Sequence, residues 1–279
     1  MSPMLAGAFR LILDPPRRGE QNMAVDEALL LHAGDGPPTI RLYGFDPAAV
    51  SVGRLQRVLD LPDGTPGVFR PEGLAALRRD GLDLVRRPTG GQAVLHDHEL
   101  TYSVVLGRRH FQPFGKRDIY RFVAGLLLRG LKQLGVGGQS ARARRGSLRE
   151  PDCFQATGEY EIASEKQRKL VGSAQMLTRE GSLPHGAIPL DGSYRRIADY
   201  LWPSGLARPP RGQPSSIGEE LGRRVDFDEA REAFAAGFAA ALGEQGVDLQ
   251  PGEASDAERA TAEELLSRRY SQDSWNLVY

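Results

Sequence analysis

The stretch of sequence that decides the fold spans residues 86–105 and reads RRPTGGQAVLHDHELTYSVV. Its paired glycines, Gly90 and Gly91, stand between two stretches with strand-like patterns, which predicts a turn inside a sheet. Because a glycine has no Cβ, its backbone can approach a ligand closely. Arg86 and Arg87, just before the turn, provide several donors for an anion or a carbonyl group. The block therefore predicts a binding turn whose amides face a ligand.

Composition and charge exclude several classes of protein. A chain of 279 residues can bury one sizeable core, or one large and one small. Lys+Arg and Asp+Glu both number 36, so the net charge is zero and nucleic-acid binding by bulk charge is disfavoured. No apolar run approaches the roughly 20 residues that span a bilayer, and residues 1–16 lack the pattern of a signal peptide. A single cysteine excludes an internal disulfide and fits a reducing cytoplasm, where we expect the protein. No Cys/His cluster has the spacing of a zinc site.

Helical and strand-like patterns alternate irregularly along the chain. Apolar spacing predicts a helix capped by Asn22 that ends near Gly34, and further helices over residues 72–79, 119–134, 226–242 and 256–270. Strand patterns cover residues 39–43, 50–52, 159–163, 169–177 and 183–190. Asp226 with Glu229, and Ser255 with Glu258, have the spacing of capping boxes. Residues 135–151 and 203–214 have loop composition, and the first of these is expected to be mobile. The economical prediction is one α+β domain with a small helical C-terminal extension.

The opening block closely resembles the signature of the superfamily of lipoate-protein ligases, octanoyltransferases and biotin-protein ligases. Further pieces resemble the same superfamily in order: NMAVDEA at 22–28, SVGRLQ at 51–56, KLVGSAQ at 169–175, HGAIPL at 185–190 and YSQDSWN at 270–276. Each piece alone is weak, but five in the right order over nearly the whole chain are strong. The resemblance implies a catalytic domain of mixed, mostly antiparallel sheets flanked by helices over residues 20–250. Residues 251–279 would form a helical extension packed on it.

Cys153 determines which branch of the superfamily is the best match. Most lone cysteines are small, buried, apolar residues, but this one stands at the edge of the polar loop 135–151. The possible strand 159–163 separates it from Lys169, and a loop-to-strand return of that length could bring the two side chains together. A cationic neighbour favours the thiolate, which is the form that attacks carbonyls. In cysteine-dependent octanoyltransferases a similar cysteine forms an acyl thioester, whereas ATP-dependent lipoate ligases generally lack it.

The resemblance implies an activity and its partners. Octanoyl would pass from octanoyl-acyl carrier protein to a lysine of a lipoyl domain, such as glycine cleavage H protein or a 2-oxoacid dehydrogenase E2 subunit. Cys153 would carry it as a thioester, and Lys169 would favour the thiolate and assist proton transfer. The expected substrate-binding residues are Arg87, Thr89, Gly90, Gly91, Ala93, His96, Gly172, Ser173, Ala174, His185 and Gly186. Val94, Leu95 and Val171 are expected to wall an apolar tunnel. We expect a monomer that needs no ATP, metal or other cofactor and binds neither nucleic acid nor membrane.

Some of these residues have a second interpretation. His96, His98 and His185 could equally satisfy backbone groups at strand ends, and the resemblance favours His96 and His185 for the site. Arg87 resembles the arginine that lines the pocket. Because neighbours in a strand face opposite sides, Arg86 is expected to point away.

Four other functions stay open. An ATP-dependent lipoate ligase would activate a free acid as an adenylate with ATP and Mg²⁺, and would not need Cys153. An octanoyl amidotransferase between lipoyl domains would differ only in its donor. A biotin ligase fits the stretch 169–175 and Cys153 less well. A non-catalytic binding module would form no acyl-enzyme.

Overall fold

The main sheet has six strands. The computed structural model describes residues 4–60, 67–140, 162–201 and 214–278. The strand order is β11-β12-β7-β3-β2-β13. The first four strands in this order pair antiparallel with one another, whereas β2 pairs parallel with both β3 and β13. The bounds of these strands are β2 Phe9–Leu13, β3 Thr39–Tyr43, β7 Glu99–Gly107, β11 Gly172–Leu177, β12 Gly181–Pro189 and β13 Leu249–Pro251.

A smaller sheet carries the first part of the block 86–105, and the rest of the block continues into β7 of the main sheet. The smaller sheet has the order β5-β4-β6, with bounds β4 Ala49–Val52, β5 Asp83–Arg86 and β6 Val94–His96. Two short antiparallel pairs complete the described strands: β1 Met4–Leu5 with β8 Phe111–Gln112, and β9 Gly138–Ser140 with β10 Ile162–Ser164. Six of the nine strand pairings in the described residues are antiparallel, so the predicted mixed, mostly antiparallel α+β architecture is confirmed.

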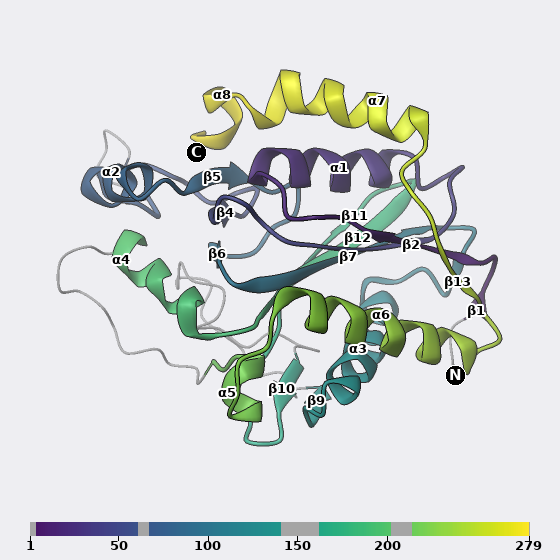
Figure 1. The fold of residues 1–279 in the computed structure, drawn as a ribbon. Coiled ribbons are helices and arrows are strands. Elements are labelled where there is room, and N and C mark those ends of the chain that lie inside the picture. The colour runs from purple at the N-terminus through teal and green to yellow at the C-terminus, as the bar shows by residue number, and fades with distance from the viewer. Residues whose placement is uncertain (1–3, 61–66, 141–161, 202–213, 279) are drawn as a thin grey trace.

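Helices cover both faces of the main sheet. Helices α1 (Gly19–Leu31) and α7 (Asp256–Leu265) lie on one face, and α3 (Lys116–Gln133) and α6 (Phe227–Gly243) lie on the other (Figure 1). Helices α2 (Pro71–Arg79) and α4 (Ile197–Leu201) lie beside the smaller sheet, and α5 (Ile217–Leu221) and α8 (Asp273–Asn276) are short. In the part of the chain that the structure describes, no helix is both long and apolar enough to cross a membrane.

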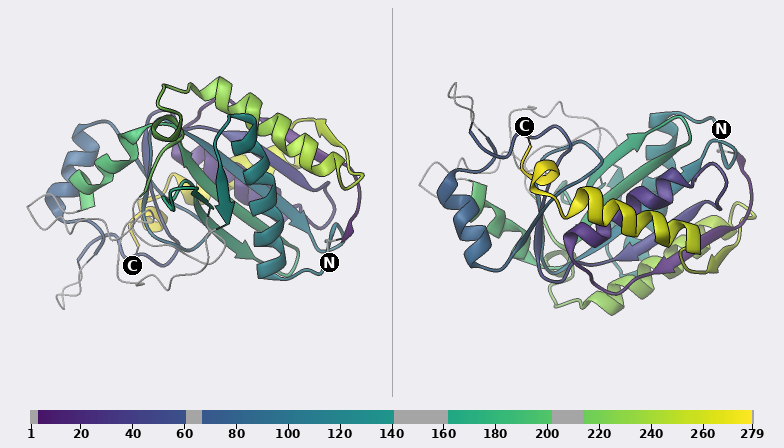
Figure 2. Two further views of the ribbon diagram at one scale, coloured as in Figure 1. Left: turned by 90° about the horizontal axis from the view of Figure 1, so that it is seen from below. Right: turned by 90° about the horizontal axis from the view of Figure 1, so that it is seen from above.

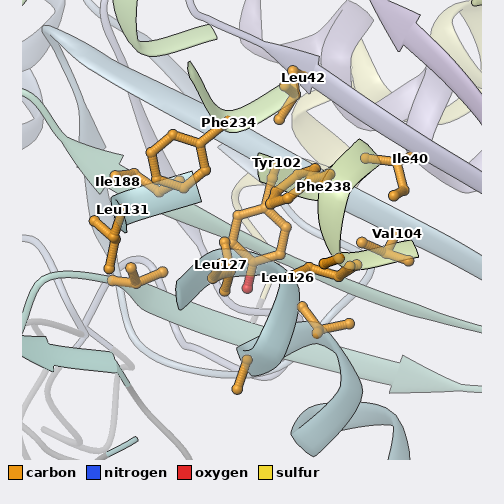
Figure 3. Packing of buried hydrophobic residues seen from close by; sticks show 14 of the residues in the cluster. Ile40, Leu42, Tyr102, Val104, Leu126, Leu127, Leu131, Ile188, Phe234 and Phe238 are labelled. Atoms are coloured by element: carbon orange, nitrogen blue, oxygen red, sulfur yellow. The ribbon is translucent and has the colours of Figure 1, made fainter. Parts of the chain in front are cut away.

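The largest core lies between the main sheet and the pair α3 and α6. Alternate residues of β7 enter it, and Leu126, Leu127 and Leu131 of α3 meet Phe234 and Phe238 of α6 there (Figure 3). Gly130 lets the two helices approach, because a Cβ at this position would lie 2.3 Å from the Phe234 ring. The other face of β7 presents Thr101 and Ser103 toward α1, together with Val105, which packs against Leu29 and Leu30, so this face combines polar and apolar residues.

The C-terminal extension packs on α1, as Figure 2 shows from above. Ser255 accepts from the Glu258 amide at 3.2 Å and Glu258 accepts from the Ser255 amide at 2.6 Å, which confirms the predicted capping box. Glu258 also accepts from Arg10 at 2.7 Å. Glu27 of α1 accepts a hydrogen bond from the Tyr270 hydroxyl at 2.6 Å. The extension is therefore tied to the core by buried polar contacts as well as by apolar packing.

Two local predictions were wrong. Helix α1 begins at Gly19, so Asn22 lies inside it instead of capping it. Its side-chain amide donates to the carbonyls of Arg17 at 3.2 Å and Gly44 at 2.8 Å, and thus ties the helix to the end of β3. Within the predicted loop 135–151, residues 138–140 form a strand, because a partner farther along the chain, Ile162–Ser164, pairs with them. The predicted strand 159–163 is described only from Ile162 onward.

Candidate active site

A narrow cavity lies between the two sheets and brings together much of the predicted site. Its interior is tight, with about 20 Å³ that the centre of a water-sized sphere can reach. Its lining includes Arg87 and His96 from the smaller sheet and Gly172, Ser173, Ala174, His185 and Gly186 from strands β11 and β12. These are seven of the eleven residues expected to bind substrate, and they come from segments that are far apart in the sequence.

The alternation of side chains along β6 decides which apolar residues reach the cavity. Val94 and His96 line it, whereas Ala93 and Leu95 pack in the hydrophobic cluster of the smaller sheet with Val50 and Val52. The expected tunnel walls Leu95 and Val171 therefore face the cores instead, since Val171 belongs to the main cluster. Of the predicted walls, Val94 has the expected orientation.

Arg87 holds the glycine turn from the cavity side. One terminal nitrogen donates to the carbonyls of Gly90 and Gln92, each at 2.9 Å. The other donates to the carbonyl and the hydroxyl of Ser51, also at 2.9 Å each. Gly91 has a φ of +94°, a conformation that favours glycine. Arg87 lines the cavity and Arg86 does not, which confirms the predicted difference between the two arginines.

His96 is fixed by a carboxylate on one side and a hydroxyl on the other. Its Nδ1 lies 2.7 Å from Glu99 Oε1, and its Nε2 lies 2.7 Å from Ser51 Oγ. Because an ionised carboxylate only accepts, Nδ1 carries the proton. Ser51 already accepts from Arg87, so its own hydroxyl donates to Nε2 when His96 is neutral. The ring of Phe45 stacks on the imidazole at 4.1 Å and limits its rotation.

His185 has the same arrangement on the opposite wall. Its Nδ1 lies 3.3 Å from Asp26 Oδ2, and its Nε2 lies 2.7 Å from Thr89 Oγ1. Burial lowers the pKa of His185, against the opposing effect of its bond to Asp26. His185 is therefore neutral at pH 7, and Thr89 donates to its Nε2. The predicted residue Thr89 thus belongs to the site through its bond to His185.

Asp26 is a buried hub that the sequence analysis missed. It is 0% exposed and accepts from Arg41 at 2.8 Å, Ser103 at 2.9 Å and Tyr43 at 2.8 Å, in addition to His185. Burial alone would raise its pKa, but the bond from His185 and the charge of Arg41 outweigh burial and leave the pKa lowered. Asp26 therefore stays ionised and fixes the proton of His185 on Nδ1.

Strand β11 presents Ser173 to the cavity, and the core supports it from behind. The hydroxyl of Tyr102, a buried core residue of β7, lies 2.8 Å from Ser173 Oγ. Lys169 precedes β11 and is buried, with 3% of its surface exposed. Its carbonyl accepts from the Ser215 amide at 2.8 Å, and its backbone bridges to Ala163. Cys153 lies outside the described residues.

Other lining residues also went unpredicted, namely Met23, Tyr43, Ser51, Thr101 and Ala187. For the buried pair of Asp26 and Arg41, the sequence did contain two signals. Arg41 is a charged residue inside the buried strand pattern of residues 39–43, and Asp26 is a charged residue on the apolar face of a helix. Charges at such positions are expected to pair with one another. His96 and Glu99 are neighbours in the sequence, but only the bend between β6 and β7 brings their side chains together.

Comparison with known proteins identifies the class of protein to which this fold and this site belong. Residues 18–239 match the model of the lipoyl protein ligase A/B catalytic domain. Since this match covers more than half of the chain, the protein belongs to that family.

Individual relatives refine the assignment. The chain is 38% identical to octanoyltransferase LipM of Symbiobacterium thermophilum, over 96% of this chain and 98% of the relative. It is 40% identical to octanoyltransferase LipM of Kyrpidia tusciae and 36% identical to that of Bacillus subtilis, each over 91% of this chain and 93% and 92% of those relatives. Among solved structures, lipoate-protein ligase A bound with ATP superposes with a TM-score of 0.76 at 23% identity, covering 97% of this chain and 98% of that one. This likeness shows the shared fold.

Proposed function

We propose that the protein carries out octanoyl transfer in lipoate biosynthesis through a covalent thioester on Cys153. The donor is octanoyl-acyl carrier protein, and the acceptor is a lysine of a lipoyl domain, such as glycine cleavage H protein or a 2-oxoacid dehydrogenase E2 subunit. The observation that carries this proposal is the chain's single cysteine, placed shortly before Lys169 in a chain up to 40% identical to octanoyltransferases.

The first half of the reaction loads the enzyme. The sulfur of Cys153 attacks the thioester carbonyl carbon, a C–S bond forms to Cys153, and the bond to the carrier's sulfur breaks. The proton lost by the Cys153 thiol reaches the departing carrier thiolate. Lys169 stabilises the thiolate and assists this transfer. Because one thioester replaces another, the step is close to balanced, so we propose that no ATP, metal or other cofactor takes part.

The second half forms the product amide. The neutral amine of the acceptor lysine attacks the Cys153 thioester, a C–N bond forms, and the bond to Cys153 breaks with return of a proton to its sulfur. Conversion of a thioester to an amide is strongly downhill and drives the cycle. Backbone amides near Gly90 and Gly91, or near Gly172 and Ser173, are the proposed stabilisers of the oxyanion.

The cavity supplies the orientation that both halves need. Arg87 fixes the glycine turn, and hydrogen bonds hold His96 and His185 in fixed orientations on opposite walls. Fixed dipoles of this kind stabilise a developing charge without reorganising during the reaction. The apolar tail of the octanoyl group packs against Val94 and Ala187, which line the same cavity.

Intact-mass measurement tests the proposal. Incubation with octanoyl-acyl carrier protein and no ATP is expected to add one octanoyl group, which hydroxylamine removes. Cys153→Ser is expected to abolish the adduct, whereas Ser267→Ala, a surface control on the C-terminal extension, keeps it. No adduct from wild type, with lipoyl-domain modification only when octanoate and ATP are supplied, would establish the ligase instead. Faster loading from an octanoylated lipoyl domain than from the carrier protein would establish the amidotransferase.

A further inference from the structure

Arg86 is fully buried at the end of β5, and the reaction described above does not use it. Its guanidinium donates to three carbonyls of the loop after β4, which we call the Gly53 loop (residues 53–56). These are the carbonyls of Gly53 at 3.0 Å, Arg54 at 3.1 Å and Gln56 at 2.7 Å. It also donates to three carbonyls of the C-terminal segment (residues 275–278), those of Trp275 at 2.8 Å, Asn276 at 3.2 Å and Val278. One side chain thus joins two segments from distant parts of the chain.

The backbone of Arg86 binds the same C-terminal segment. Its amide donates to Asn276 Oδ1 at 2.9 Å, and its carbonyl accepts from Trp275 Nε1 at 3.0 Å. Asn276 in turn donates from Nδ2 to the Tyr270 carbonyl at 2.7 Å. Asn276 is therefore fixed at both ends of its amide, and it determines where the C-terminal segment meets β5.

The Gly53 loop in turn supports the glycine turn, residues 88–92. The Arg54 amide donates to the Thr89 carbonyl at 2.8 Å, and Gln56 Nε2 donates to Gln92 Oε1 at 2.8 Å. The two segments also touch closely, because a Cβ at Gly53 would lie 2.0 Å from the Gly91 carbonyl oxygen. A shift of the Gly53 loop must therefore displace the glycine turn.

We propose that Arg86 and the C-terminal segment are positioning elements for octanoyl transfer, which set the geometry of the glycine turn through the Gly53 loop. This inference rests on the proposed function, in which the turn faces the acyl group. The consecutive arginines then have complementary tasks. Arg87 holds the turn from the cavity side, and Arg86 fixes the loop behind it.

The chemistry of the guanidinium explains why an arginine serves here. Its planar fork presents five N–H donors in fixed directions, so it can order several carbonyls at once, whereas a lysine has one mobile ammonium. Misplacing reacting groups by about 1 Å can slow a reaction on the order of 100-fold. We therefore expect loosening of the clamp to slow acylation by about 10- to 100-fold.

Asn276→Ala tests the clamp, because it removes the acceptor for the Arg86 amide while keeping the guanidinium. Tyr270→Phe is the matched control: it loses a buried hydrogen bond to Glu27 in the same C-terminal region but touches neither Arg86 nor the Gly53 loop. Three quantities are measured below the melting transition: acylation by octanoyl-acyl carrier protein, alkylation of the single cysteine by iodoacetamide, and the dissociation constant of octanoate. Arg86→Lys is a second variant, which keeps the charge but loses the fork.

Asn276→Ala is expected to slow acylation and weaken octanoate binding while alkylation stays at the wild-type rate. Tyr270→Phe is expected to lower the melting temperature and leave all three quantities unchanged. Wild-type acylation and octanoate binding by Asn276→Ala would overturn the inference. So would an equal loss in Tyr270→Phe, or a parallel loss of alkylation, which would indicate general loosening.

The result also separates the two proposals. If wild type forms no acyl-enzyme, the proposed thioester mechanism fails, and octanoate binding alone decides whether Arg86 positions the turn. If wild type neither becomes acylated nor binds octanoate, the turn is not an acyl site and both proposals fall.

Discussion

Replacing Asp26 with asparagine should cost a large part of the protein's stability. The substitution keeps the shape of the side chain but removes the charge that faces Arg41, which is 0% exposed. Removing one member of a buried ion pair costs about 3–5 kcal/mol. Arg41 retains Asp14 at 2.7 Å, so we expect the lower end, about 3 kcal/mol. At about 2–4 °C per kcal/mol, the melting temperature should fall by roughly 6–12 °C.

The same substitution should also change the site. Asp26 accepts four hydrogen bonds on its two oxygens, but an amide has one accepting oxygen, and its nitrogen can only donate. If Arg41 and Ser103 keep the amide oxygen, the amide nitrogen faces Tyr43 and His185. His185 must then carry its proton on Nε2 and donate to Thr89, which reverses the bond described above. Octanoyl transfer measured well below the melting temperature should fall by more than tenfold.

Urea unfolding followed by circular dichroism gives the free energy, and intact-mass kinetics give the transfer rate. Glu264→Gln provides the control, since its ion pair with Arg268 is largely exposed and should contribute almost nothing. A loss of less than about 1 kcal/mol in Asp26→Asn would refute the assignment of Asp26 as the charged partner of Arg41. Unchanged transfer would refute its role in orienting His185.

Three further predictions follow from single contacts. Gly53→Ala places a methyl group 2.0 Å from the Gly91 carbonyl oxygen, so octanoate binding should weaken and the unfolding free energy should fall by about 1–3 kcal/mol. Gly243→Ala is the control, because nothing lies within 4 Å of its added methyl group, and it should change neither quantity in this way. Because burial lowers the folded-state pKa of His185 below 6.5, the unfolded chain gains the proton first as pH falls. Urea titrations should therefore show that the unfolding free energy decreases as the pH falls below about 6.5, by up to about 1.4 kcal/mol per pH unit for this proton. His185→Asn should flatten that slope, while the exposed His98→Asn should not. Ser255→Ala removes the cap of α7 and should cost about 1 kcal/mol by the same measurement, and an unchanged value would show that the cap is dispensable.

Local patterns in the sequence predicted most helices and strands, because side-chain periodicity and capping residues lie within the element that they determine. Residues 39–43 alternate and form β3 with those bounds, and the spacing of Ser255 and Glu258 places the start of α7 correctly. The cavity residues of β11 and β12 were found through resemblance, since their own glycines and alanines indicate little. Asn22 misled the prediction because an asparagine can bond to carbonyls from inside a helix as well as cap it.

What the sequence could not provide were contacts between distant segments. Strand β13, near the end of the chain, pairs with β2, near its beginning, and no local pattern indicates the partner. The pairing of Asp26 with Arg41 and the clamp at Arg86 are of the same kind: each residue is unusual alone, but its partner depends on the complete fold. The prediction that Leu95 lines the tunnel was wrong for a related reason. Neighbouring residues of β6 point to opposite sides, so Val94 faces the cavity and Leu95 faces the core.

The two sheets keep separate hydrophobic cores, one under β7 and one around β4. Among the described residues, the contacts that cross the seam at the site include the Thr89–His185 and His96–Glu99 hydrogen bonds, the stacking of Phe45 on His96, and the small cluster of Val94, Ala187 and Tyr194. The spacing of the two sheets at the site is therefore set by these few polar contacts and side chains, and not by the packing of either large core.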